Sequence, residues 1–149
     1  MIHLKQAITG QTIWITGKER SKYIVGWEAQ GICFILTDEL TEREVFFSVP
    51  YGSRIPLPSV IITDRYFKIP GIDTNFTQPA TNGGVDAEDA GYFSYVCWEA
   101  DDITNKKPNF DDLDEFLFIE RGLCLIGPHQ EYFEDFDEDI PASVAYTGT

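Results

Sequence analysis

The clearest indication of the fold lies in Gly91–Glu99, which reads GYFSYVCWE. Aromatic and β-branched residues dominate this segment and a glycine precedes them, which is typical of a β-strand rather than of a helix. Side chains alternate between the two faces of a strand, so one face carries Phe93, Tyr95, Cys97 and Glu99. We expect the opposite face to pack against the core, because it carries Trp98 together with Tyr92, Ser94 and Val96.

Segments of the same kind lie on both sides of this strand. They are Gln11–Thr16, Lys22–Glu28, Gly31–Thr37, Arg43–Val49, Ser59–Phe67 and Glu115–Ile126. A link of two residues joins the second of these to the third, which predicts a hairpin. No segment combines helical spacing with the length of about ten residues that a helix needs. A series of about seven or eight short strands predicts an all-β fold, and specifically an antiparallel β-sandwich.

Two features interrupt this regular pattern. Residues Pro70–Ala90 contain a second proline and three glycines, so we expect a long loop, a feature that is often functional. The last predicted strand is interrupted at Arg121 and Gly122, where an unbroken strand would carry a side chain at the glycine position. We expect Gly122 to have a positive φ, to form a bulge or to have a close backbone neighbour.

Charge is distributed very unevenly along the 149 residues. The chain carries 25 acidic and 11 basic residues and a net charge of −14. Residues 1–85 carry eight of each sign, whereas residues 86–149 carry 17 acidic and three basic residues, so the second part holds the whole net charge. Direct binding to a nucleic-acid backbone requires a basic face, so we do not expect it here. A basic protein partner, a cation, or electrostatic repulsion between copies of the chain fits this charge better.

The three cysteines are expected to be buried and free of disulfide bonds. Each lies in an apolar run, their number is odd, and no two have the spacing of a CxxC pair: Cys33, Cys97 and Cys124. No apolar stretch approaches the roughly 18–20 residues that span a bilayer, and the first residues lack the pattern of a signal peptide. We therefore expect a protein that is made in a reducing compartment and has no contact with a membrane.

Motifs that would carry catalysis or bind a metal are weak. The acidic run Glu134–Asp139 has enough oxygen atoms for Ca²⁺, but it lacks the glycine turn of a calcium loop. Glu99 and Glu120 lie on predicted strands and could face each other like the carboxylate pair of a glycosidase, but carboxylates in such positions usually cap or solvate a sheet. Nucleophile and phosphate-binding motifs do not occur in the sequence. We expect no enzyme activity, no cofactor and no metal.

The C-terminal residues 128–149 are interpreted as an acidic arm that follows a domain of residues 1–127. The arm mixes acidic and aromatic residues, and aromatic side chains are frequent anchors in protein interfaces. We therefore predict that it binds a partner through Tyr132, Phe133, Asp135, Phe136 and Asp137. The alternative, which remains open, is that the arm packs on its own domain.

One part of the chain resembles a known family. Gly91–Glu99, followed by Glu120–Gly127 (ERGLCLIG), is similar to the hairpin that ends small immunoglobulin-like domains in virion proteins of tailed bacteriophages. The shared pattern is a glycine, an aromatic strand that ends in an acid, a polar gap, and then E-x-G with alternating apolar residues. The gap at Ala100–Asp114 is longer than usual. The resemblance implies an immunoglobulin-like sandwich and no catalytic residues.

The expected function follows from this resemblance and from the charge. We expect a structural protein of a bacteriophage particle, in the capsid, the head–tail connector or the tail, which binds other virion proteins and copies of itself. It would be located in the virion, assembled in the host cytoplasm, and would bind no small-molecule substrate. The alternative is a small acidic inhibitor or immunity protein that covers a basic nucleic-acid-binding or catalytic site.

Overall fold

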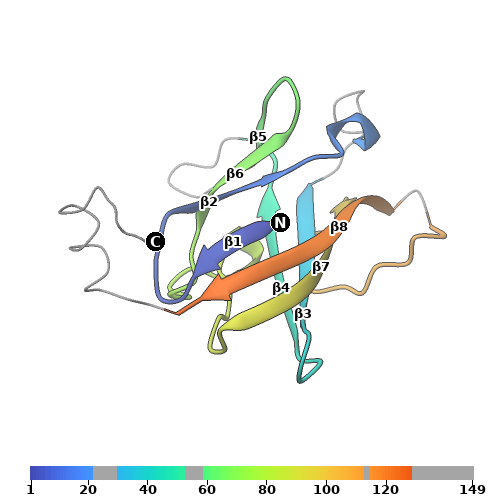
Figure 1. Ribbon diagram of the computed structural model, residues 1–149. Helices are drawn as coiled ribbons and strands as arrows, with labels where there is room; N and C mark the ends of the chain where they lie inside the picture. The colour runs from blue at the N-terminus through green and yellow to red at the C-terminus, as the bar shows by residue number, and fades with distance from the viewer. Residues whose placement is uncertain (22–29, 53–58, 113–114, 129–149) are drawn as a thin grey trace.

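The computed structural model describes residues 1–21, 30–52, 59–112 and 115–128, which form two β-sheets (Figure 1). The first sheet has the order β1-β8-β7-β3-β4, and the second has the order β2-β6-β5. The strands of the first sheet are β1 (Ile2–Lys5), β3 (Gly31–Asp38), β4 (Glu44–Pro50), β7 (Gly91–Ala100) and β8 (Phe116–Gly127). Those of the second are β2 (Gln11–Ile15), β5 (Ile61–Ile62) and β6 (Phe67–Ile72). Two single turns of 3₁₀ helix, η1 (Lys18–Arg20) and η3 (Ala80–Asn82), complete the regular structure of these residues.

The all-β prediction is confirmed, whereas a purely antiparallel arrangement is wrong. Strand β1 runs parallel to β8, with Ile2 opposite Cys124 and Lys5 opposite Gly127. These two strands come from opposite ends of the described chain, so no tight turn forces them to run antiparallel. The other strand pairs are antiparallel, including the predicted β7–β8 hairpin.

Most strand boundaries agree with the sequence to within about one residue, but one predicted strand is wrong. The segment Ser59–Phe67 is divided by a turn in which the Thr63 hydroxyl donates to the Tyr66 carbonyl oxygen at 2.8 Å. Strand β6 begins only after this turn and continues through Pro70, at the start of the expected loop. A bulge accommodates the proline, because the register of β2 and β6 shifts there and Gly71 has a φ of 73°. The predicted strand Lys22–Glu28 and its hairpin lie outside the described residues.

The loop that follows β6 is organised around a buried carboxylate. Asp73 is fully buried and accepts hydrogen bonds from the backbone N–H groups of Asn75, Thr77 and Gln78, at 2.8–3.0 Å, and from the Thr77 hydroxyl. Burial acts to raise the pKa of Asp73, but the hydrogen bonds from these residues outweigh it and lower the pKa. Hydrogen bonds to the Asp73 carboxylate, rather than regular secondary structure, therefore fix this part of the loop.

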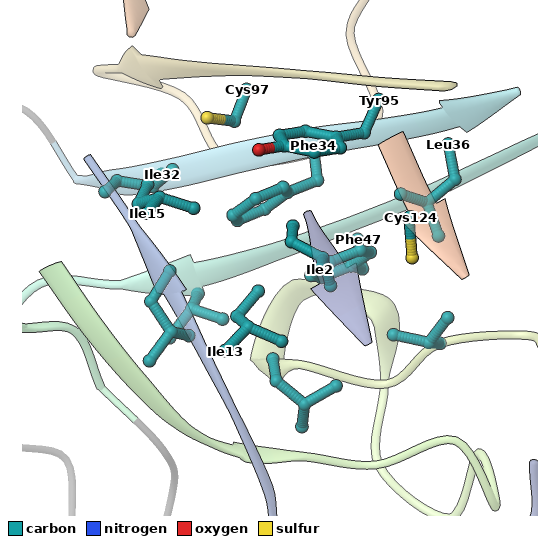
Figure 2. Close-up of a cluster of buried hydrophobic side chains, with 14 of the residues drawn as sticks. Ile2, Ile13, Ile15, Ile32, Phe34, Leu36, Phe47, Tyr95, Cys97 and Cys124 are labelled. Carbon is teal, nitrogen blue, oxygen red and sulfur yellow. The ribbon is translucent and has the colours of Figure 1, made fainter. Parts of the chain in front are cut away.

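The main core lies between the two sheets (Figure 2). Phe93, Tyr95 and Cys97 of β7 point into it, so the predicted choice of core face is wrong. Trp98 is fully buried as expected, but it belongs to a second apolar cluster on the outer face of the large sheet. The division of the β7 side chains into two faces was predicted correctly, but the face that meets the main core was not. Trp98 is buried on the other face because the connection from β7 to β8 folds back and covers it. Phe110 of this connection packs edge-on against Trp98, with 6.3 Å between the ring centroids.

Strand β8 continues through Arg121 and Gly122 without a break. The irregularity lies earlier, where Cys97 pairs with Glu120 and Trp98 pairs with Phe118, so Ile119 is the extra residue of a bulge. Gly122 does not have a positive φ, and its close neighbour is the side chain of Tyr95 rather than backbone. None of the three features expected at Gly122 is therefore present there, but the site is crowded, by a side chain.

Candidate interaction surfaces

The residues predicted to bind a partner are outside the part of the chain that the structure describes. They are Tyr132, Phe133, Asp135, Phe136 and Asp137, and the boundary of the acidic arm at residue 128 lies at the end of the described residues. Their role therefore remains a prediction. The described residues instead show a buried carboxylate cluster at Glu99, a half-buried one at Glu120, and three exposed surfaces.

The first carboxylate cluster is centred on Glu99, near the end of β7. Its side chain is fully buried and accepts hydrogen bonds from the Ser21 hydroxyl and the Tyr51 hydroxyl, each at 2.5 Å. Hydrogen bonds to a buried charge offset the cost of removing it from water. Glu99 therefore ties the residue after η1 and the residue after β4 to the large sheet, a role that its sequence position did not indicate.

The second cluster is centred on Glu120 of β8. One carboxylate oxygen accepts from the Thr16 hydroxyl and from the Thr16 backbone N–H at 3.1 Å, and the other accepts from the Tyr95 hydroxyl at 2.5 Å. Burial, followed by the hydrogen bond to Glu120, raises the pKa of Tyr95. Glu99 and Glu120 were considered as a catalytic pair, but each is engaged by hydroxyl groups of the domain and connects segments that are distant in the chain.

The cysteines are buried and free, as the sequence predicted. Burial raises the pKa of Cys124 to about 12, and it also raises the pKa values of Cys33 and Cys97. Within the described residues, no group of three or more His, Cys, Asp and Glu side chains is arranged to hold a metal ion. The thiols therefore act as small apolar core side chains in this fold.

The first exposed surface is a groove of about 490 Å³ on the outer face of the large sheet. Its lining includes Phe110 of the β7–β8 connection, Ile35 and Val96 of the central strands, and Arg121 and Leu123 of β8. Leu123 is 43% exposed although it lies on a paired strand. The β7–β8 connection thus covers only one end of this sheet face and leaves an apolar groove beside it.

The second surface lies on the outer face of the small sheet, and we name it the basic aromatic surface. Trp14, Lys68 and Ile61 pair across β2, β6 and β5 and form a row on this face. The ring of Tyr66 contacts Trp14 edge-on, with 4.9 Å between centroids, and the Lys68 ammonium lies 5.4 Å from the Trp14 ring centroid. We include Lys18 and Arg65 in this surface: Lys18 Nζ donates to the carbonyl oxygen of Thr63, and Arg65 is exposed in the turn that contains Thr63.

The third surface lies around the turn between β3 and β4, and we name it the acidic hairpin surface. Leu40 is 93% exposed at the tip of the turn, and Tyr92 is 56% exposed beside it. The backbone N–H of Glu39 donates to the Tyr92 carbonyl oxygen at 3.1 Å, which joins the turn to β7. Its centre is a groove of about 430 Å³ between the turn and the start of β7, which Asp38, Glu39 and Asp89 line. Glu42 is exposed in the same turn, and Arg43 lies 4.0 Å from the Asp89 carboxylate.

The sequence contained a usable signal for the second surface only. Trp14 lies between Ile13 and Ile15, and alternation predicts that one of the two sets faces away from the core. The surroundings of Trp14 and Leu40 come from segments far apart in the chain, so neither surface was identified from the sequence. Large exposed apolar residues that gather in one place are typical of interaction sites.

Comparison with models of known protein families and with curated proteins gives no match to this chain. In the described residues, no helix has the length and the apolar character needed to cross a membrane.

Proposed function

We propose that the protein is a structural component of a bacteriophage particle, in the capsid, the head–tail connector or the tail. It acts through protein–protein assembly contacts, and its acidic arm, with Tyr132, Phe133 and Phe136 as anchors, binds another virion protein. The observation that carries this proposal is the presence of exposed apolar and aromatic side chains on both sheets, at Trp14, Ile61, Tyr66 and Tyr92. Such side chains suit assembly contacts between proteins.

The strand order supports the immunoglobulin-like part of the proposal. The strands of immunoglobulin domains are lettered in the order in which they occur along the chain. In domains of the variable type, one sheet contains strands G, F, C and C′, and the other contains B, E and D. With β2 to β8 taken as B, C, C′, D, E, F and G, the orders β8-β7-β3-β4 and β2-β6-β5 agree with that arrangement. The β7–β8 hairpin then corresponds to strands F and G, which is the pair that carries the resemblance to phage virion domains.

The core departs from that of antibody domains. Antibody domains join strands B and F by a disulfide, whereas Cys97 on β7 is a free thiol. The space between the sheets is filled instead by apolar side chains, among them the stacked rings of Phe34 and Phe47 at a centroid distance of 4.6 Å (Figure 2). A core without a disulfide is suited to a protein that assembles in the reducing cytoplasm of a host cell.

The test is incorporation into particles. The full-length chain, with an affinity tag, is produced in the host during infection by the phage that encodes it, and particles are isolated by density gradient. We expect the chain to band with the particles at a fixed ratio to the other virion proteins. A chain that stays at the top of the gradient in every preparation overturns the proposal.

Two full-length variants separate the contributions of the arm. Replacing Tyr132, Phe133 and Phe136 with serine removes the aromatic anchors and should reduce incorporation strongly. Replacing Asp135 and Asp137 with asparagine keeps the anchors and should mainly slow association and reduce its salt dependence. If the serine variant is incorporated normally, the aromatic residues of the arm are not needed for assembly, and that part of the proposal is wrong.

A second candidate function is an acidic inhibitor or immunity protein, and the acidic hairpin surface favours it. Glu39 and Glu42 present negative charge beside the exposed Leu40, which suits a basic binding site on an enzyme. An inhibitor binds one basic enzyme in a fixed ratio, with an affinity that falls steeply as salt is added. Particle incorporation without such a complex separates the two functions in favour of the first.

A further inference from the structure

We infer that the protein self-associates head to tail: the acidic hairpin surface of one copy binds the basic aromatic surface of the next. This inference rests on the proposed assembly function and names one partner for it, a second copy of this chain. It depends only on described residues, and not on the C-terminal arm.

The acidic hairpin surface is ordered so that it can dock without rearrangement. Asp38 Oδ1 accepts hydrogen bonds from the backbone N–H groups of Leu40 at 2.8 Å and Thr41 at 3.2 Å, which fixes the turn. The same N–H groups hold the pKa of Asp38 below its usual range, so this carboxylate is charged at neutral pH. The turn therefore presents Leu40 as a projecting apolar side chain beside the exposed carboxylates of Glu39 and Glu42.

The basic aromatic surface has the complementary composition. Trp14 is 49% exposed and Ile61 is 45% exposed, so each offers apolar area to a projecting side chain. Lys68 lies over the Trp14 ring, and Lys18 Nζ reaches the carbonyl oxygen of Thr63 after β5. Arg65 is exposed in the same turn as the carboxylate of Asp64. An aromatic residue with cations at its border is a typical anchor site in protein interfaces, and opposite charges on the two surfaces guide the encounter.

The two surfaces lie at opposite ends of the domain. In Figure 1 the turn between β3 and β4 is at the lower end, whereas the turn between β5 and β6 and the helix η1 are at the upper end. One copy therefore cannot satisfy both of its surfaces by itself. A contact between two different surfaces is heterologous, and it produces a ring if the rotation closes and a filament if it does not. Either form is compatible with a particle component.

The first experiment measures the size of the full-length protein by sedimentation velocity over a range of concentrations. We expect oligomers that grow with concentration and that dissociate as salt is raised, because screening weakens the charge contacts. Leu40→Ser on one surface, and Trp14→Ser or Lys68→Glu on the other, should each weaken association by at least about tenfold. Leu123→Ser is the matched control, since Leu123 is similarly exposed but lies on the groove of the large sheet.

The second experiment mixes two variants and is specific for a head-to-tail contact. Leu40→Ser copies keep an intact basic aromatic surface, and Trp14→Ser copies keep an intact acidic hairpin surface. Each variant alone should be monomeric, and the mixture should form dimers of one copy each but no larger species. Circular dichroism of each variant establishes that it is folded.

Several results would overturn the inference. They are a monomeric wild-type protein at all concentrations, loss of association in Leu123→Ser, or a mixture that stays monomeric. Loss of association in the arm variant, with Tyr132, Phe133 and Phe136 replaced by serine, would show that the arm makes the contact between copies instead. If self-association fails while the chain still bands with particles, only this inference is lost. If self-association holds while incorporation fails, only the proposed function is lost.

Discussion

The ring of Tyr95 on β7 lies over Gly122, its partner on β8. A Cβ atom at Gly122 would be 3.0 Å from Tyr95 Cε1 and 3.1 Å from the Tyr95 hydroxyl oxygen. The hydrogen bond from this hydroxyl to Glu120 holds the ring in place. The glycine is therefore required by the position of a side chain on the next strand, and not by a special backbone conformation of its own.

The first prediction concerns this contact. Gly122→Val should lower the free energy of unfolding by about 1–3 kcal/mol, as expected when a side chain is forced into a packed site. Gly122→Ala should cost less, because the ring needs to move by only a few tenths of an ångström. Urea denaturation measures both effects.

A double-mutant cycle provides the control for the first prediction. In the Tyr95→Leu background the ring is absent, so Gly122→Ala should cost less than it does in the wild type. Equal costs in the two backgrounds would show that the glycine is needed for another reason.

The second prediction concerns Trp98. Although it lies outside the main core, it is fully buried under Phe110, so Trp98→Ala should cost about 3–5 kcal/mol. Trp14→Ala is the matched control, since that side chain is half exposed, and its effect on stability should be much smaller. Equal losses in the two variants, measured by urea denaturation, would contradict the buried position of Trp98.

The third prediction concerns the reactivity of the cysteines. Burial keeps the thiols of Cys33, Cys97 and Cys124 protonated and away from solvent, and only the thiolate reacts readily. At about pH 8 Ellman's reagent should modify none of them in the native protein and all three in denaturant. Because their pKa values are higher in the folded than in the unfolded protein, the stability that they contribute is present at neutral pH. It should be lost as the pH rises above about 9. Rapid modification of the native protein would contradict this account.

The fourth prediction concerns the buried carboxylate of the loop. Asp73→Asn replaces one acceptor oxygen with a donor that faces N–H groups, and it should cost about 1–3 kcal/mol. The pKa of Asp73 is lower in the folded protein, so its contribution is present above about pH 4 and is lost as the pH falls further. Chemical denaturation of Asp73→Asn between about pH 3 and pH 7 should therefore show a weaker dependence on pH than that of the wild type. Asp111→Asn, at an exposed position, is the control and should leave the stability unchanged.

Local sequence determined the class of the fold and most strand positions. Alternation and β-branched or aromatic content depend only on neighbouring residues, so Gly31–Asp38 and Gly91–Ala100 were identified to within about a residue. The apolar runs around the cysteines likewise predicted their burial. Where a side chain overrides the local pattern, as Thr63 does in the turn after Ile61–Ile62, sequence reasoning merged two strands into one.

Tertiary structure alone decided which face of each strand is covered and which surfaces remain open. Alternation divides the side chains of β7 into two sets, but the set that meets the main core depends on where the small sheet packs. The burial of Trp98 on the other face depends on the return of Phe110 from the following connection. The parallel β1–β8 pair, the crowding of Gly122 by Tyr95, and the separation of the two charged surfaces to opposite ends (Figure 1) all involve residues distant in sequence. Such contacts form only when the whole chain packs, so the periodicity of a single segment does not predict them.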